Sequence, residues 1–118
     1  MANKLNPMVV RVHETDEVFT LEFSRESVKF AENRGFAIGE VGDFPMTKIP
    51  DLFFYAFRKN HRNIARSRTD EILIKDLGGL TKEHIERLIQ LYAQPMEAIV
   101  RIEEDEESAK NQNATVEL

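Results

Sequence analysis

The sequence contains no cysteine, which excludes a disulfide framework, a thiolate metal site and a cysteine nucleophile. It also lacks a long hydrophobic run. Its most apolar stretch, residues 49–57, is interrupted by Pro50 and Asp51 and falls well short of the ~20 apolar residues of a membrane span. The amino end has no apolar stretch typical of a signal peptide. We therefore expect a cytosolic protein with no membrane segment.

Common signatures of nucleotide-binding and metal-dependent enzymes are missing as well. The sequence has no Gly-x-x-x-x-Gly-Lys, no Gly-x-Gly-x-x-Gly and no His-Glu-x-x-His. His13, His61 and His84 are scattered, and the position four residues after His84 holds Leu88 instead of a second ligand. The sequence therefore predicts structural or solvent roles for the histidines and no metal or cofactor.

What the chain does contain suits one small folded body. It has 118 residues, of which 42% are hydrophobic and 31% charged, enough for one ordinary core. Its net charge of −5 comes from the carboxyl end alone. Removing the six acids and one base of residues 103–118 from the total of 21 acids and 16 bases leaves 15 of each. We predict a neutral single domain over residues 1–102 and a flexible, disordered acidic tail over residues 103–118.

Residues 8–23 carry two runs in which apolar and polar side chains alternate, joined by a polar stretch containing Asp16. Period-two alternation on both sides of a polar connection predicts a β-hairpin. Its apolar face would consist of Met8, Val10, Val12, Phe19, Leu21 and Phe23. A lone hairpin is marginal in water, so helices of this chain or a partner must cover that face.

After the hairpin the sequence predicts a mainly helical chain, and hence an α+β fold. Four helices are expected, over about residues 25–34, 48–66, 70–77 and 82–101. Ser24, Thr47, Thr69 and Thr81 each offer a hydroxyl as an N-cap, and Pro95 predicts a kink or break near Gln94. The connection over residues 36–46 is expected to contribute core side chains: Phe36, Ile38, Val41 and Phe44.

The second predicted helix has more apolar surface than one core-facing side requires. One arc contains Ile49, Leu52, Phe53, Ala56, Phe57 and Ile64. Phe54 and Tyr55 lie on either side of that arc. Two interpretations remain open: the two rings pack under the hairpin, or they form a surface on which a partner docks.

The carboxyl half of the same predicted helix is strongly basic. Arg58, Arg62 and Arg66 are spaced by four and would form one stripe, which continues towards Arg68 and which Tyr55 extends by one turn. Such a stripe would suit phosphate contacts with base stacking. The alternative is a solvated face whose arginines pair with acids elsewhere, including those of the tail.

Several segments together resemble the small tail assembly chaperones of long-tailed, siphovirus-type bacteriophages that infect Gram-positive bacteria. The resemblance is carried by residues 21–36 (LEFSRESVKFAENRGF) and 45–59 (PMTKIPDLFFYAFRK). It continues in the same order through residues 78–80 (GGL), 88–92 (LIQLY) and Pro95, and so covers about residues 18–100. No catalytic signature is involved.

The resemblance implies a non-enzymatic protein made in the host cytoplasm and absent from the finished virion. Such chaperones bind and solubilise the tape measure protein and help to deliver tail tube subunits to it. Related genes commonly produce a longer second product by ribosomal frameshifting. Candidate partner-binding residues are Phe54, Tyr55, Arg58, Arg62 and Leu91. The hairpin edge and the surplus apolar surface also predict self-association into a homo-oligomer.

Two other functions remain open from the sequence. A small nucleic-acid-binding regulator would use the basic stripe from Arg58 to Arg68 and would bind DNA in a salt-sensitive manner, although the neutral body makes nucleic acid the less favoured partner. A structural tail component would instead co-purify with virus particles.

Overall fold

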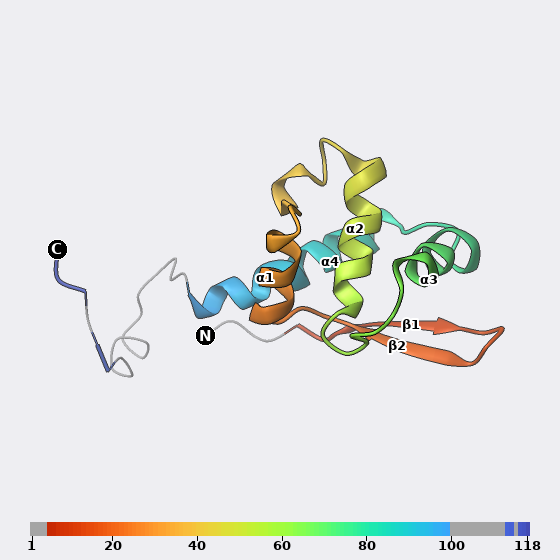
Figure 1. The fold of residues 1–118 in the computed structure, drawn as a ribbon, viewed down its shortest axis with the longest axis horizontal. Coiled ribbons are helices and arrows are strands. Elements are labelled where there is room, and N and C mark those ends of the chain that lie inside the picture. The colour runs from red at the N-terminus through yellow and green to blue at the C-terminus, as the bar shows by residue number, and fades with distance from the viewer. Residues whose placement is uncertain (1–4, 100–112, 115) are drawn as a thin grey trace.

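The computed structural model describes residues 5–99, 113–114 and 116–118, and it shows an N-terminal hairpin followed by four α-helices (Figure 1). This confirms the predicted α+β, mainly helical fold. The strands are β1 (Met8–Val12) and β2 (Glu17–Leu21). The α-helices are α1 (Arg25–Asn33), α2 (Pro45–Phe57), α3 (Arg66–Glu71) and α4 (Lys82–Ala93). Short helices of other types are η1 (Ile38–Glu40), η2 (Ile72–Asp76) and η3 (Gln94–Ala98).

The hairpin has the predicted apolar face. Its strands pair antiparallel with Val10 opposite Phe19 and Met8 opposite Leu21, so these side chains share one side of the sheet. Five side chains of the predicted face are buried in the core: Val10, Val12, Phe19, Leu21 and Phe23. Met8 is half-buried and packs against that core. Asp16 makes the turn with a φ of 60°, a conformation that Asp tolerates better than most residues. Helices of the same chain therefore cover the hairpin.

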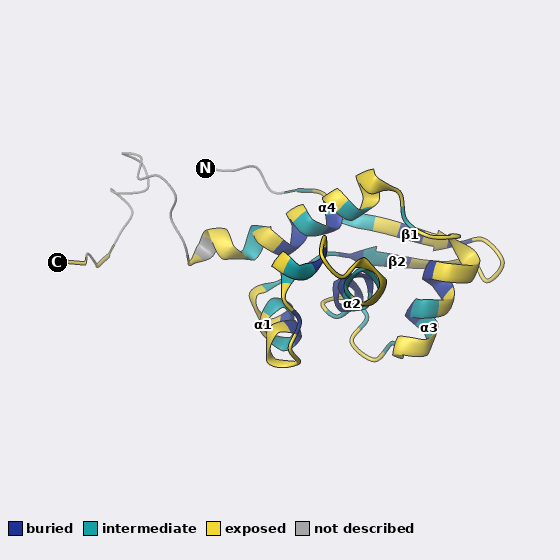
Figure 2. Cartoon of the chain, turned by 90° about the horizontal axis from the view of Figure 1, so that it is seen from above, coloured by how far each residue is buried: buried dark blue, intermediate teal, exposed yellow. Residues whose placement is uncertain are grey.

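Helix α2 is the central element of that cover. It contacts β2, α1, α3, α4 and η1, and it crosses the hairpin near the middle of the molecule (Figures 1 and 2). Its fully buried side chains are Leu52, Phe53, Ala56 and Phe57. Their spacing places them on one side of the helix, where they meet the buried face of the hairpin in one hydrophobic cluster. Burial of this face is the main source of the helix's stability.

Helices α1 and α4 begin where their caps were predicted. The Ser24 hydroxyl accepts a hydrogen bond from the Ser27 N–H, and the Thr81 hydroxyl accepts one from the His84 N–H. In each case the side chain of the third residue bonds back to the cap, which completes a capping box. The break predicted at Pro95 is also confirmed, because the α-helix ends at Ala93 and a 3₁₀ helix follows.

The predicted helix over residues 48–66 is wrong at both ends. Helix α2 begins at Pro45, whose fixed φ suits a first helical position, and ends at Phe57. Six polar residues follow, 58–63, and offer no apolar side for a continued helix to bury. The loop instead turns back to β2: the Asn60 amide donates to the Thr20 carbonyl at 3.1 Å, and the Thr20 N–H donates to His61 Nε2 at 2.9 Å.

The predicted start of the third helix at residue 70 is also wrong. The chain becomes helical at Arg66, and Thr69, expected as its cap, lies inside helix α3 and is fully buried. The Thr69 hydroxyl donates to the Arg66 carbonyl at 3.0 Å, which satisfies it without solvent. The chain continues as the π-helix η2 and stops at Gly78 and Gly79, both with positive φ.

Two other predictions concern the connection over residues 36–46 and the acidic tail. Phe36 and Val41 are core residues and Ile38 packs against the core, but Phe44 is 56% exposed, so its predicted core position is wrong. Phe44 directly precedes α2, where the chain changes direction. The predicted acidic tail over residues 103–118 lies outside the described residues, apart from 113–114 and 116–118.

Candidate partner-binding surfaces

The predicted basic stripe does not exist as one helical face. Arg58 and Arg62 lie in the loop after α2, whereas Arg66 opens α3. Arg66 donates to Asp51 Oδ1 and to Asp70 Oδ1, each at 2.9 Å. Burial opposes its charge, but these two hydrogen-bonded carboxylates outweigh that effect and raise the pKa of Arg66. Arg66 therefore belongs to an ion-pair network and is not available as a phosphate ligand.

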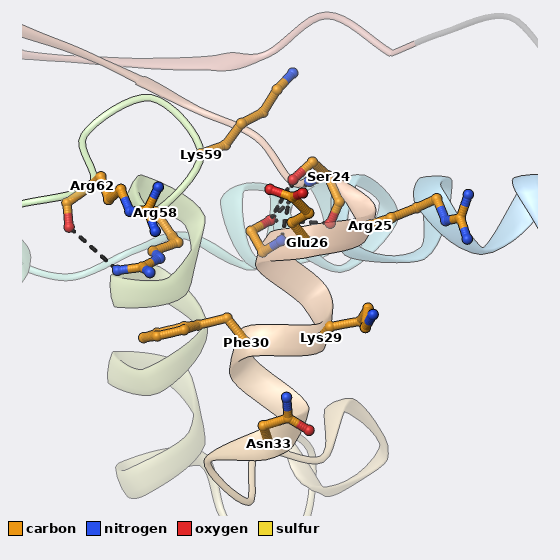
Figure 3. Close-up of a pocket in the computed structure, with 10 residues that line it drawn as sticks. Ser24, Arg25, Glu26, Lys29, Phe30, Asn33, Arg58, Lys59 and Arg62 are labelled. Atoms are coloured by element: carbon orange, nitrogen blue, oxygen red, sulfur yellow. Dashed lines mark hydrogen bonds between the residues drawn. The ribbon is translucent and has the colours of Figure 1, made fainter.

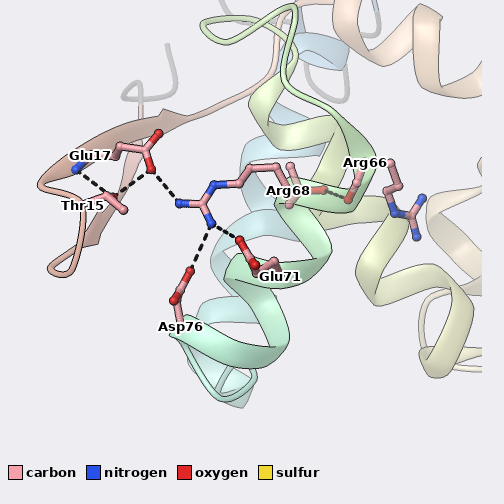
Figure 4. Close-up of polar contacts among 7 residues, drawn as sticks. Thr15, Glu17, Arg66, Arg68, Glu71 and Asp76 are labelled. Atoms are coloured by element: carbon pink, nitrogen blue, oxygen red, sulfur yellow. Dashed lines mark hydrogen bonds and ion pairs between the residues drawn. The ribbon is translucent and has the colours of Figure 1, made fainter.

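Arg68 is likewise committed to partners within the fold (Figure 4). Its guanidinium donates to Glu17 at 2.6 Å, to Glu71, and lies 3.5 Å from Asp76. Glu17 is held on its other side by the Thr15 hydroxyl at 2.8 Å. The hydrogen bonds from Thr15 and Arg68 lower the pKa of the Glu17 carboxyl. Arg68 thus ties the end of the hairpin to α3 and η2.

A basic groove runs between α1 and the loop after α2 (Figure 3). It has a volume of about 730 Å³, and we define it by five cationic side chains that line it: Arg25, Lys29, Arg58, Lys59 and Arg62. Glu26 is the one acid among the described residues that line it. Lys59 is paired with Glu22 at 3.2 Å. The other four cations leave the groove strongly positive although the body as a whole is neutral.

Phe30 forms the apolar part of this groove. The Arg58 guanidinium lies 3.8 Å from the centre of its ring and that of Arg34 lies 4.3 Å from it. Such cation–π contacts hold a planar cation in place while leaving its edge free to donate hydrogen bonds. One of those donors reaches the Arg62 carbonyl at 3.5 Å. Arg58 is thereby positioned. No local pattern predicts this contact, because Phe30 is 28 residues away along the chain.

Tyr55 and Leu91, two of the predicted partner-binding residues, lie in the core. Tyr55 is 7% exposed and packs its ring against Phe30 and Phe36, and burial together with the nearby Asp51 raises its pKa. Leu91 is 2% exposed. Neither side chain presents a surface to a partner in this structure. Phe54 packs against the core but stays half-buried, with the Arg66 guanidinium 5.6 Å from its ring.

Part of the apolar surface that remains exposed lies at the start of α2. Met46, in its first turn, is 88% exposed, and Phe44, immediately before the helix, is 56% exposed. The two residues are separated by Pro45 alone. Sequence reasoning missed them because Phe44 reads as a core residue. The available signal was Pro45, since a proline at the first helical position marks a helix start and leaves its neighbours at a helix end.

The three histidines do not form a cluster in the described part of the chain. Within residues 5–99, 113–114 and 116–118 no three His, Cys, Asp or Glu side chains lie close enough together to hold a metal ion. His61 accepts from the Thr20 N–H and packs edge-on against Phe19, and His84 completes the cap of α4. His13 is exposed at the end of the hairpin. Structural roles are thus assigned to His61 and His84.

Comparison with known proteins gives a family. The profile of the family described as Domain of unknown function (DUF5055) matches residues 1–118. The chain belongs to this family. Neither the curated proteins nor the solved structures contain a match to the chain. Among the described residues, no helix has both the length and the apolar content needed to cross a bilayer.

Proposed function

We propose that the protein is a tail assembly chaperone of a long-tailed bacteriophage. In this role it binds and solubilises the tape measure protein and helps to recruit tail tube subunits during tail morphogenesis. It acts in the cytoplasm of the host bacterium, without enzymatic activity, and does not remain in the mature virion. The resemblance over residues 18–100 supports this function, and those residues extend from β2 to the end of the described body.

The observation that carries the proposal is the exposed pair Phe44 and Met46. Large apolar side chains at a helix start lose contact with water when a client helix packs on them. Met46 lies at the beginning of residues 45–59, a segment that bears the resemblance, and Phe44 directly precedes that segment. This moves the proposed client-binding surface from Phe54 and Tyr55, where the sequence placed it, to the start of α2, at the other end of that helix from Arg58.

Co-expression with the tape measure protein encoded in the same genome tests the proposal. We expect the wild-type chain to keep this client in the soluble fraction and the double variant Phe44→Ser/Met46→Ser to lose most of that effect. The matched control is Val9→Thr/Val18→Thr, which removes two other exposed apolar side chains from the outer face of the hairpin. If the wild-type chain leaves the client insoluble, the proposed function is wrong. If the two double variants solubilise the client equally well, Phe44 and Met46 are not the client-binding surface.

Self-association is part of the same proposal. In the described residues β1 pairs with β2 alone, so its other edge presents unpaired backbone groups around Val9 and Arg11. A second copy could add to this edge. Sedimentation velocity at rising protein concentration should show species larger than one chain, and a lone monomer at high micromolar concentration would contradict this part.

The alternative of a nucleic-acid-binding regulator now rests on different residues. Arg66 and Arg68 are paired with acids, but the basic groove is lined by Arg25 and Lys29 from α1 and by Arg58 and Arg62 from the loop after α2. Tight, salt-dependent binding of duplex DNA together with failure to solubilise the client would favour the regulator.

A further inference from the structure

The basic groove contains cations that have no acidic partner in the described part of the chain. Arg25 and Lys29 lie one turn apart on α1, and Arg62 lies opposite them on the loop after α2. No ion pair joins any of these three to a carboxylate within residues 5–99. By contrast, Lys48, Lys59, Arg66 and Arg68 all have one. A local excess of positive charge in a neutral body favours an acidic occupant.

The sequence supplies such an occupant. Residues 103–107 read EEDEE, five consecutive acids and the only run of that length in the chain. Lys59 is paired with Glu22, which leaves four of the five cations that define the groove. The five negative charges of the run are close in number to these four positive charges.

The last described helix before this run lies beside α1. Helix η3 contacts α1, and α1 supplies Arg25 and Lys29 (Figures 1 and 3). Ala98, the last residue of η3, precedes the run by five residues. At ~3.4 Å per residue an extended chain from Ala98 reaches up to about 17 Å at residue 103 and about 30 Å at residue 107. Helix α1, with nine residues, is only about 14 Å long.

We propose that residues 103–107 bind in the basic groove of the same chain. A short tether gives the run a local concentration in the millimolar range, so individually weak ion pairs suffice. The docked run occupies the cations that would otherwise contact external polyanions. The groove is thereby a self-masked site, and its occupancy falls as salt screens the charges beyond a Debye length of about 10 Å at 0.1 M. This binding does not depend on the proposed chaperone function.

The absence of cysteine makes a direct test possible. Ser108→Cys, beside the acidic run, provides a single attachment point for a nitroxide spin label on the full chain. At low salt we expect the amide signals of Lys29 and Asn33, which line the groove, to lose most of their intensity, while that of Glu14 at the far end of the hairpin keeps it. The loss should disappear in high salt. Unchanged Lys29 and Asn33 signals at low salt would overturn the proposal.

A matched variant separates charge from mere proximity. Changing residues 103–107 to their amides (Glu103→Gln, Glu104→Gln, Asp105→Asn, Glu106→Gln and Glu107→Gln) keeps the length and the label position while removing the charge. We expect the signal loss to vanish in this variant, and persistent loss would contradict an electrostatic site.

A mixture of ¹⁵N-labelled chain and spin-labelled chain without ¹⁵N tests whether the run comes from the same chain. Broadening as large as in the singly labelled chain would mean that a second copy supplies the run, which overturns binding within one chain.

A second measurement reads the masking itself. A fluorescent single-stranded DNA should bind the amide variant at least about tenfold more tightly than the wild-type chain at low salt. Adding Arg25→Gln, Lys29→Gln and Arg62→Gln should abolish that gain, because it removes cations with which the groove would contact the DNA. These substitutions break no ion pair of the described residues. Equal affinity of the wild-type chain and the amide variant would show that the run does not mask the groove. Neither readout involves the tape measure protein, so failure of one proposal is distinguishable from failure of the other.

Discussion

The Nε2 atom of His61 accepts a hydrogen bond from the backbone N–H of Thr20 at 2.9 Å. Thr20 lies on the edge of β2 that faces away from β1, and Asn60 donates to its carbonyl oxygen at 3.1 Å. The Glu22 N–H on the same edge donates to the Ala56 carbonyl at 3.2 Å. The loop after α2 therefore closes one edge of the two-stranded sheet, which would otherwise present unpaired backbone groups.

His61→Ala should destabilise the fold by about 1–3 kcal/mol, because it leaves a partly buried N–H without an acceptor and removes ring contacts with Phe19 and Phe57. Urea unfolding measures the change. His61→Gln retains an acceptor of similar reach and should recover part of the loss. If His61→Ala unfolds at the wild-type urea concentration, the loop does not stabilise the sheet.

Tyr55→Ala should cost about 3–5 kcal/mol of unfolding free energy, since it removes a core ring packed between Phe30 and Phe36. Phe54→Ala, at the neighbouring half-buried position, should cost less than half as much. Thermal unfolding followed by circular dichroism compares the two. Equal losses would contradict the different burial of these two rings, and a fully folded Tyr55→Ala chain would return Tyr55 to the candidate surface residues.

Arg68→Gln should destabilise the fold slightly at neutral pH by releasing Glu17, Glu71 and Asp76 (Figure 4). The folded pKa of Glu17 is lowered by Thr15 and Arg68, so its contribution is present above the ordinary glutamate pKa near 4.5 and is lost as pH falls below it. The difference between Arg68→Gln and wild type should therefore shrink in acid. The control Glu17→Gln should show a weaker dependence on acid pH than wild type, and a constant Arg68→Gln difference between pH 7 and pH 3 would contradict the pairing.

The two tyrosines should resist ionisation while the chain is folded. Burial, with smaller effects from Glu32 and Tyr55, raises the pKa of Tyr92 to about 12, and burial raises that of Tyr55 as well. Both raised values stabilise the folded state below the ordinary tyrosine pKa near 10, and this stabilisation is lost as pH rises through the folded values. Ultraviolet titration should show little tyrosinate near pH 10 until the chain unfolds.

Tyr92→Phe isolates Tyr55 in the same titration. The Tyr92 hydroxyl is buried without a hydrogen-bond partner in the described part of the structure, so this variant should be as stable as wild type or more stable. Ordinary titration of both rings in the folded wild-type chain would contradict their burial.

Local sequence signals predicted most of the fold. The alternation of residues 8–12 and 17–21 predicted the hairpin and its buried face, and hydroxyl caps at Ser24 and Thr81 predicted where α1 and α4 begin. Pro95 predicted the break after α4. These features succeed because each depends on a few neighbouring residues: the direction of successive side chains in a strand, the unsatisfied N–H groups of a first helical turn, or a missing backbone donor.

The candidate surfaces could not be predicted in the same way. The regular spacing of Arg58, Arg62 and Arg66 predicted one stripe, yet Arg58 stacks on Phe30 while Arg66 bonds to Asp51 and Asp70. The end of α2 depended on hydrogen bonds to β2 from a loop about 40 residues further along the chain.

By itself, then, the sequence determined the hairpin and its apolar side, the starts of α1 and α4, and the acidity of residues 103–107. Only the tertiary structure decided that Tyr55 is core, that Met46 is exposed and that α1 and the loop after α2 form a basic groove. The physical reason is distance along the chain. Periodicity and capping act over a few residues, whereas burial and charge pairing depend on which distant segments meet.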